Sequence, residues 1–295
     1  MEEVDWDRTV FALICPDALA MHLGLAVLER IESEGFTLVA WRVLWHRPAD
    51  LDSFHEQNIT QAWKAYRYRL VDQYFAFGPT VALLMADQCP AGDQQHSCHE
   101  RLRLAKGPSD PAGSGPGTIR GDLGSINGML GLMHCSDSAA DSARESAVFA
   151  GPGGFAGGGD PGELRTMLAL LELSVPRQDR GYREVLAGLR ARAIAGAWED
   201  LPGPVQKTAG AMLEAGAAEL AAPGSGERLA ALLPDAHPLA ALLAADFTPS
   251  SPGPDPKRVN LLLATFGTGI DEWESLVLAT SRRFTPRGLD HSSAS

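Results

Sequence analysis

The sequence predicts an α/β sandwich of ferredoxin-like type with an antiparallel sheet in its N-terminal half, followed by an all-α helical domain. Up to about residue 150, β-rich apolar runs alternate with segments of helical periodicity, whereas nearly every later segment is helical and rich in Ala and Leu. Between the halves stands a Gly-rich stretch, 151–162 (GPGGFAGGGDPG), with too little side-chain surface to pack. We therefore predict an α/β domain over 1–150, a linker over 151–162, a helical domain over 163–284 and a disordered tail over 285–295.

The first half begins with a buried strand at 9–14 (TVFALI), which Pro16 ends. Apolar side chains at helical spacing predict a helix over 18–34, and Gly35 stands where its C-cap would be. A strand is predicted next at 36–44, then a helix over about 51–75 and a strand at 80–85. A loop over 86–125 follows, then a strand at 129–133 and a helix from about 138. This β-α-β-α-β-loop-β-α order fits an antiparallel α/β sandwich.

The second half predicts an all-α bundle or a short helical array. Its helices are expected near 163–174, 180–199, 204–221, 226–245 and 257–282, separated by segments rich in Pro and Gly. Their apolar stripes are more typical of a bundle core than of a partner groove, although a protein partner for this half stays open. Four arginines of the second helix (Arg180, Arg183, Arg190 and Arg192) are interpreted as a solvated face, with a lid or partner surface as the alternative.

Charge and composition limit the class of protein. With 25 Lys and Arg against 37 Asp and Glu, the net charge is −12, which argues against a nucleic-acid coat but not against a small anion held by a few arginines. No run approaches 18 apolar residues, so no membrane span is expected, and the acidic N-terminus does not resemble a secretory signal. The four cysteines are irregularly spaced, and the group Cys89, His96, Cys98 and His99 lacks zinc-site spacing, so we predict a cytoplasmic protein without a metal site.

One histidine stands where phosphate chemistry is favoured. His134 ends an apolar run just before a helix that Ser136, Asp137 or Ser138 would cap. Imidazole attacks phosphorus well when an acceptor holds one ring nitrogen and the other is free, and Glu145 could supply that acceptor. By itself the pattern is more typical of a surface or capping histidine.

Two arginines near this histidine in the sequence could bind the charge of a transferring phosphoryl group. They are Arg103 and Arg120. Arginine pairs are usually solvated or structural, so this signal also needs support from elsewhere in the chain.

That support comes from a family resemblance over residues 7–150, which look like a nucleoside diphosphate kinase. Six segments occur in the family's order: 9–17 (TVFALICPD), 34–39 (EGFTLV), 77–82 (FGPTVA), 107–112 (GPSDPA), 116–122 (PGTIRGD) and 134–138 (HCSDS). The fifth reproduces the family's Pro-Gly-Thr-Ile-Arg-Gly-Asp without a change, and the last resembles its active-site His-Gly-Ser-Asp-Ser. Several ordered matches are much stronger evidence than one Gly-rich hit.

The resemblance implies a phosphotransferase that works through a phosphohistidine. Its histidine takes the γ-phosphoryl group of ATP, with Mg²⁺ on the phosphates, and passes it to another nucleoside diphosphate. It makes His134 the nucleophile, Glu145 its orienting partner and Ser136 a hydrogen-bond donor near that glutamate. Family members are commonly oligomers, so a homo-oligomer is expected.

The resemblance also implies a phosphate site beside the histidine. Arg103 and Arg120 would bind phosphates, and Ser109 would take the place of the family's phosphate-binding threonine. Cys15 would line the same site, because it stands where the family's first strand carries a lysine that meets the γ-phosphate.

The departures from the family remodel this site. A neutral thiol at Cys15 cannot replace the positive charge of an ammonium. Losing such a charge commonly lowers the rate of phosphoryl transfer by about two or more decades. The family's asparagine three residues before the histidine is Gly131, and the segment from Arg120 to His134 is one residue longer than in the family. Segment 45–70 lacks the family's aromatic positions for the base.

Three hypotheses for the function follow from these observations. The first is a phosphotransferase that moves the ATP γ-phosphoryl group through His134 to a nucleoside diphosphate or related acceptor. The second is a catalytically impaired nucleotide-binding pseudokinase whose helical half binds a partner, which Cys15 and Gly131 favour. The third is a scaffold recruited to different chemistry in specialised metabolism.

Overall fold

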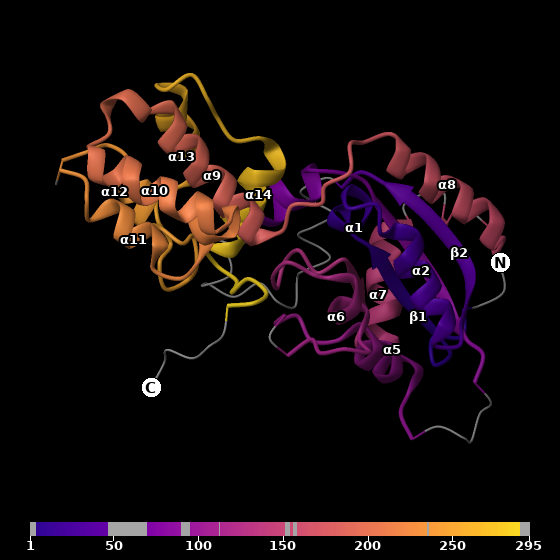
Figure 1. The fold of residues 1–295 in the computed structure, drawn as a ribbon. Coiled ribbons are helices and arrows are strands. Elements are labelled where there is room, and N and C mark those ends of the chain that lie inside the picture. Colours follow the sequence, from indigo (N-terminus) through magenta and orange to yellow (C-terminus); the bar gives the residue numbers. More distant parts are fainter. Residues whose placement is uncertain are drawn as a thin grey trace. The chain divides into compact units, whose positions relative to one another are not determined.

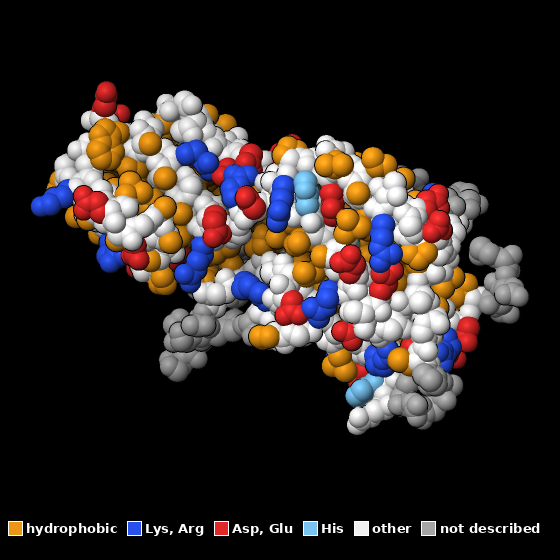
Figure 2. Space-filling view, turned by 45° about the vertical axis from the view of Figure 1, so that its right-hand side comes forward, with side chains coloured by type: hydrophobic (Ala, Val, Ile, Leu, Met, Phe, Trp, Pro, Cys, Tyr) orange, Lys and Arg blue, Asp and Glu red, His pale blue; other side chains and the backbone are white. Residues whose placement is uncertain are grey.

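The chain forms two compact units in a computed structural model that describes residues 4–46, 70–89, 95–111, 113–150, 154–155, 158–234 and 236–289 (Figure 1). The first unit comprises residues up to Ser125 together with Leu130–Gln178, and the second comprises Ile126–Met129 together with the chain from Asp179 onward. No helix among these described residues is both long enough and apolar enough to cross a membrane. Acidic and basic side chains alternate over the visible face in Figure 2 and form no single basic surface there.

The first unit is built on a four-stranded sheet in the order β2-β3-β1-β4. The strands are β1 (Thr9–Ile14), β2 (Phe36–Leu44), β3 (Thr80–Asp87) and β4 (Met133–Cys135). Every pairing is antiparallel, and the register of β1 and β4 places Leu13 opposite His134. The predicted α/β sandwich with an antiparallel sheet is confirmed.

Both faces of the sheet are covered, which explains why β1 is buried at every position and apolar from Val10 to Ile14. Val10, Ala12 and Ile14 join one buried cluster with α2, whereas Phe11 on the other face stacks on Phe149 of α7 with ring centroids 5.3 Å apart. His134 shares the α7 face, because residues paired across two strands point to the same side. The alternation therefore directs this histidine toward the helix that carries Glu145.

The helices of the first unit differ from the prediction in two places. Their bounds are α1 (Pro16–Ala20), α2 (Gly24–Ser33), α5 (Cys98–Lys106), α6 (Ile119–Leu123), α7 (Ala139–Ala150) and α8 (Pro161–Leu173). The helix expected over 18–34 is broken into α1 and α2, because His22 between them has a left-handed backbone (φ 57°). The stretch 86–125, expected to be a loop, contains α5 and α6. Residues 70–76 are helical, and the rest of the helix expected over 51–75 lies outside the described residues.

Side-chain caps begin both unexpected helices. The Ser97 hydroxyl accepts the Glu100 N–H at 3.2 Å, and the Thr118 hydroxyl accepts the Gly121 N–H at 3.0 Å. Ser97 and Glu100 match the Ser-x-x-Glu signature of a helix start, so the sequence carried a signal for α5.

Helix α8 belongs to the first unit, although the sequence places the domain boundary before it, at 151–162. Leu164 and Leu168 are fully buried in the same cluster as residues of α1 and α2. The Glu172 carboxylate accepts the Gly24 N–H at 2.7 Å, and Arg165 pairs with Glu32. The division of the chain therefore falls after Gln178 rather than inside the Gly-rich stretch.

The second unit is all-α, as predicted. Its helices are α9 (Tyr182–Gly196), η2 (Trp198–Asp200), α10 (Gly203–Ala215), η3 (Ala217–Ala221), α11 (Ser225–Ala230), α12 (Ala240–Ala244), α13 (Pro256–Ala264) and α14 (Glu272–Ser281). The two last predicted helices are each divided in two, because α11 ends at Ala230 and α12 begins at Ala240, and α13 ends at Ala264 and α14 begins at Glu272. Of the expected tail, 290–295 lie outside the described residues, and the Arg287 N–H donates to the Ile126 carbonyl at 2.8 Å.

The second unit also includes a short piece of the loop between α6 and β4. The side-chain amide of Asn127 donates to the Thr280 hydroxyl at 2.8 Å and to the Ser281 hydroxyl at 3.2 Å, all fully or almost fully buried. Residues Ile126–Met129 lie between Arg120 and His134 in the sequence, so part of the loop that connects these two residues belongs to the second unit.

Candidate active site

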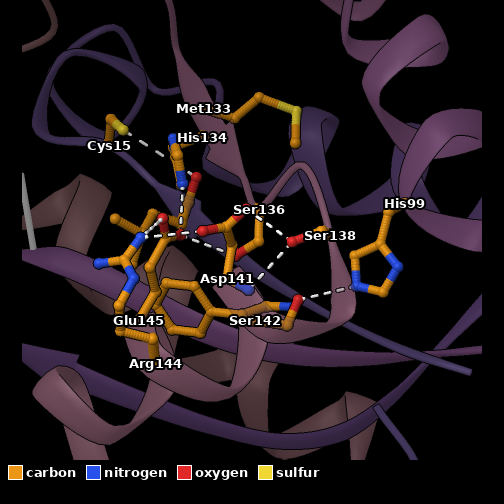
Figure 3. Close-up of polar contacts among 12 residues, drawn as sticks. Cys15, His99, Met133, His134, Ser136, Ser138, Asp141, Ser142, Arg144 and Glu145 are labelled. Atoms are coloured by element: carbon orange, nitrogen blue, oxygen red, sulfur yellow. Dashed lines mark hydrogen bonds and ion pairs between the residues drawn. The ribbon is translucent and has the colours of Figure 1, made fainter. Parts of the chain in front are cut away.

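The candidate nucleophile lies on the short edge strand β4. The His134 Nε2 atom lies 2.8 Å from the Glu145 Oε2 atom, and the imidazole side chain is 33% exposed (Figure 3). Because a carboxylate can only accept a hydrogen bond, Nε2 must donate in this contact, which fixes the tautomer with hydrogen on Nε2. Nδ1 is then the nitrogen with a free electron pair.

Glu145 is itself held by two further donors. The Ser136 hydroxyl donates to Glu145 Oε2 at 2.7 Å, and the Arg144 guanidinium donates to Oε1 at 3.0 Å (Figure 3). At the start of α7, the Ser138 hydroxyl accepts the Asp141 N–H at 3.1 Å and so caps the helix. The carboxylate that faces the histidine therefore has little freedom to rotate.

The pKa values of both partners lie below their ordinary values, for different reasons. Burial lowers the pKa of His134, and the nearby Lys106 and Arg120 charges lower it further, while the hydrogen bond and charge of Glu145 oppose them. Burial raises the pKa of Glu145, but the contacts with His134, Ser136 and Arg144 outweigh it, and the net shift is downward. At neutral pH the pair is a neutral imidazole and a carboxylate, which is the form a nucleophile needs.

The lowered pKa of His134 predicts how its charge depends on pH. At pH 6.5, where an ordinary imidazole is half protonated, more than half of His134 should stay neutral, and protonation should follow at lower pH. A titration of His134 by nuclear magnetic resonance, with the resonance assigned by its absence in His134→Ala, measures this. Midpoint protonation above pH 6.5 would contradict the prediction.

Arg120 is buried and engaged with the backbone. Its Nε donates to the Gly131 carbonyl at 3.0 Å, Nη1 to the Gly107 carbonyl at 3.1 Å and Nη2 to the Met133 carbonyl at 3.0 Å. Nη1 also lies 3.2 Å from the Ser109 hydroxyl, which joins two of the predicted phosphate ligands. In this state Arg120 ties three loop and strand carbonyls together.

The glycine at 131 has a physical reason in this arrangement. A Cβ atom at that position would lie 3.1 Å from the Nε and Nη2 atoms of Arg120, tighter than ordinary packing allows. Gly131 therefore leaves room for the guanidinium to lie flat against the backbone, where the family's asparagine would push it aside.

The other predicted arginine, Arg103, does not contact His134 or Arg120 among the described residues. Arg103 lies on α5 with its side chain 48% exposed, and its nearest carboxylate is Glu100 at 3.8 Å. The structure thus brings together His134, Glu145 and Ser136 as one group and Arg120 and Ser109 as another, and it leaves Arg103 in solvent.

Cys15 is a buried neutral thiol. Burial raises its pKa to about 12, and the negative charge of Asp17 adds to the effect. It therefore supplies no charge to a phosphate group, as the sequence comparison with the family lysine implied.

Asp17 is a positioning residue that the sequence argument missed. It is fully buried, accepts the Tyr74 hydroxyl at 2.6 Å and accepts the Leu132 N–H at 2.9 Å. Leu132 has a left-handed backbone (φ 68°), a conformation that costs about 1 kcal/mol and needs such an anchor. The carboxylate therefore fixes the entry to β4 two residues before His134, and only the motif Cys15-Pro16-Asp17 signalled it.

The described residues contain no group of three or more His, Cys, Asp or Glu side chains that could hold a metal ion. His96 pairs with Glu100 at 2.9 Å, and the buried His99 contacts Cys98 and Ser142. All four cysteines are free thiols.

Comparison with known proteins places this site in a family. The family model for nucleoside diphosphate kinase matches residues 7–153. The nucleoside diphosphate kinase of Pasteurella multocida is 34% identical over 143 residues, which cover 48% of this chain and 93% of that protein. That of Archaeoglobus fulgidus is 30% identical over 143 residues, covering 48% and 85%. A nucleoside diphosphate kinase family protein of known structure from Babesia bovis is 25% identical, covers 49% of this chain and 89% of that chain, and has a TM-score of 0.41.

The edge strand of this antiparallel α/β sandwich thus carries a histidine whose ring is oriented by a carboxylate, the arrangement that an activated nucleophile needs. The chain belongs to the nucleoside diphosphate kinase family, and the matched segment ends close to the Gly-rich stretch. At the level of the family, this supports transferase, kinase and nucleotide-binding character for the first unit.

Proposed function

We propose that this protein transfers the γ-phosphoryl group of ATP to a nucleoside diphosphate or a related acceptor through a phosphohistidine at His134. The observation that supports this most directly is the 2.8 Å contact between His134 Nε2 and Glu145 Oε2, which places the ring hydrogen on Nε2 and the lone pair on Nδ1. Family membership supports the nucleotide as substrate.

The proposed step keeps every proton in place. The Nδ1–P bond forms as the bond between the γ-phosphorus and the β,γ-bridging oxygen breaks, and that oxygen leaves with the bonding pair on ADP. The ring then carries positive charge, because Nε2 keeps its hydrogen, and the Glu145 carboxylate stabilises this charge. The reverse reaction with a second nucleoside diphosphate returns the histidine to its neutral form.

Magnesium belongs to the substrate in this proposal. Mg²⁺ prefers oxygen ligands, keeps several waters and is commonly held through substrate phosphates, so MgATP can bring it without a cluster of protein carboxylates. The protein's own part is to hold the phosphates and to orient the imidazole, with Arg103, Arg120 and Ser109 as the proposed phosphate ligands.

Incubation of the purified full-length chain with Mg²⁺ and γ-labelled ATP tests the proposal. We expect an acid-labile, base-stable label that maps to the peptide containing His134 and that passes to added nucleoside diphosphates. No label, with nucleotide binding still detected by calorimetry, would overturn the transferase and favour the second candidate.

That second candidate is the nucleotide-binding pseudokinase, or a scaffold recruited to other chemistry, with a partner on the helical unit. The buried neutral thiol of Cys15 favours it, because it removes a charge from the phosphate site. We also propose a cytoplasmic homo-oligomer, and light scattering on the purified chain measures the assembly.

A further inference from the structure

The phosphate side of the histidine lacks a cation from strand β1. Cys15 directly follows this strand as a neutral thiol, and the Arg120 guanidinium, which we propose as a phosphate ligand, also donates to three carbonyls. A transferring phosphoryl group carries several negative charges, and its transition state requires positive groups aimed at it in a water-poor site.

A second cation of the same unit is buried. Lys106, the last residue of α5, is 8% exposed. None of the ion pairs found among the described residues includes it. Burying an ammonium without a counter-charge is costly, so a negatively charged ligand at this position would be stabilised.

The surroundings of Lys106 are those of the candidate active site. Its ammonium faces the thiol of Cys135, the residue after His134, and its charge acts on Cys15 and His134 as well. His134 and Cys135 belong to β4, against which α5 packs.

Lys106 also directly precedes the loop 107–109, which contains the proposed phosphate ligand Ser109. Gly107 ends α5 with a left-handed backbone (φ 86°), and its carbonyl accepts Arg120 Nη1. Ser109, two residues further, contacts the same Nη1 atom. Lys106 is therefore adjacent in the chain to the loop that Arg120 holds through Gly107 and Ser109.

We propose that Lys106 is a catalytic residue that contacts the transferred phosphoryl group and supplies the ammonium that Cys15 lacks. The cation has moved from the end of β1 to the end of α5. The flexible four-carbon stem lets the ammonium follow the phosphorus from the bridging oxygen to His134 Nδ1, and it keeps its three hydrogens throughout. The inference rests on the proposed function.

The test compares the initial rate of His134 labelling by MgATP in three variants with the wild type. Lys106→Met keeps the length of the side chain and removes its charge, and we expect a fall of about 100-fold. The double variant Cys15→Lys with Lys106→Met returns an ammonium to the end of β1, and we expect it to recover at least about tenfold of that loss. Lys257→Met, an exposed lysine of α13, controls for the change in net charge and should match the wild type.

Each outcome decides the inference. Thermal unfolding of each variant shows whether it is folded, and the recovery in the double variant separates a lost charge from a lost fold. Equal labelling of wild type and folded Lys106→Met would overturn the role of Lys106 and leave the transferase intact. A slow Lys106→Met variant that the double variant does not recover would assign the loss to packing and also overturn it. No label in the wild type would overturn the proposed function, and this inference with it.

Discussion

Replacement of His134 by alanine is expected to abolish labelling by γ-labelled ATP, a fall of at least about three orders of magnitude. The reason is direct, because the alanine has no nitrogen to form the bond to phosphorus. The fold should survive, since the Glu145 carboxylate keeps the Ser136 hydroxyl and the Arg144 guanidinium as partners. The measurement is the acid-labile label per chain at fixed ATP concentration.

A matched control separates this loss from any effect of removing a histidine. His96 has a side chain 40% exposed and pairs with Glu100 on the surface, so His96→Ala should label at the wild-type rate. Glu145→Gln adds a graded arm, because it keeps the shape of the side chain and removes the charge that stabilises the phosphorylated ring. We expect about a 10- to 100-fold slower rate in that variant. Full labelling of His134→Ala would show that another residue takes the phosphoryl group.

The sheet and the histidine group could be predicted because their signals are local. Strands β1 and β3 are runs of apolar residues covered on both faces, and such runs are visible in a sequence. The partnership of His134 and Glu145 follows from a strand leading into a helix that folds back over the same face. Chemistry alone then suggests which carboxylate meets the ring.

Other parts of the site could not be predicted, because they depend on contacts between distant residues. Helix α5 is polar and short, so hydrophobic periodicity gives little sign of it, and its last residue looks like a solvated lysine. The burial of Lys106 becomes visible only once α5 is placed against β4. Likewise, the three carbonyls that accept Arg120 carry no side-chain signal in the sequence.

The position of the domain boundary also could not be predicted from the sequence alone. A Gly-rich stretch indicates where the backbone is free, but it does not say which unit the next helix joins. Leu164 and Leu168 decide this by packing on α1 and α2, so the change of unit comes one helix later than the change of composition.

The helical unit depends on one buried arginine, and its removal is the largest stability effect that we expect. Arg190 is fully buried, although the sequence analysis grouped it with a solvated face. Its guanidinium donates to the carbonyls of Leu220, Leu243 and Ala245 at 2.7 to 3.1 Å and pairs with Asp246 at 2.7 Å. It therefore ties α9 to the ends of η3 and α12.

Arg190→Met should destabilise this unit by about 3–5 kcal/mol, because it leaves buried carbonyls and a carboxylate without their donor. In calorimetry the transition of the helical unit should fall by at least about 10 °C. Arg183→Met on the same helix is the matched control, since Arg183 is exposed and donates to the Gly288 carbonyl near the end of the described chain, and it should change the stability by about 0.5 kcal/mol or less. Equal effects of the two variants would mean that the η3 and α12 carbonyls find other donors, and that packing of the apolar stripes alone holds the helical unit together.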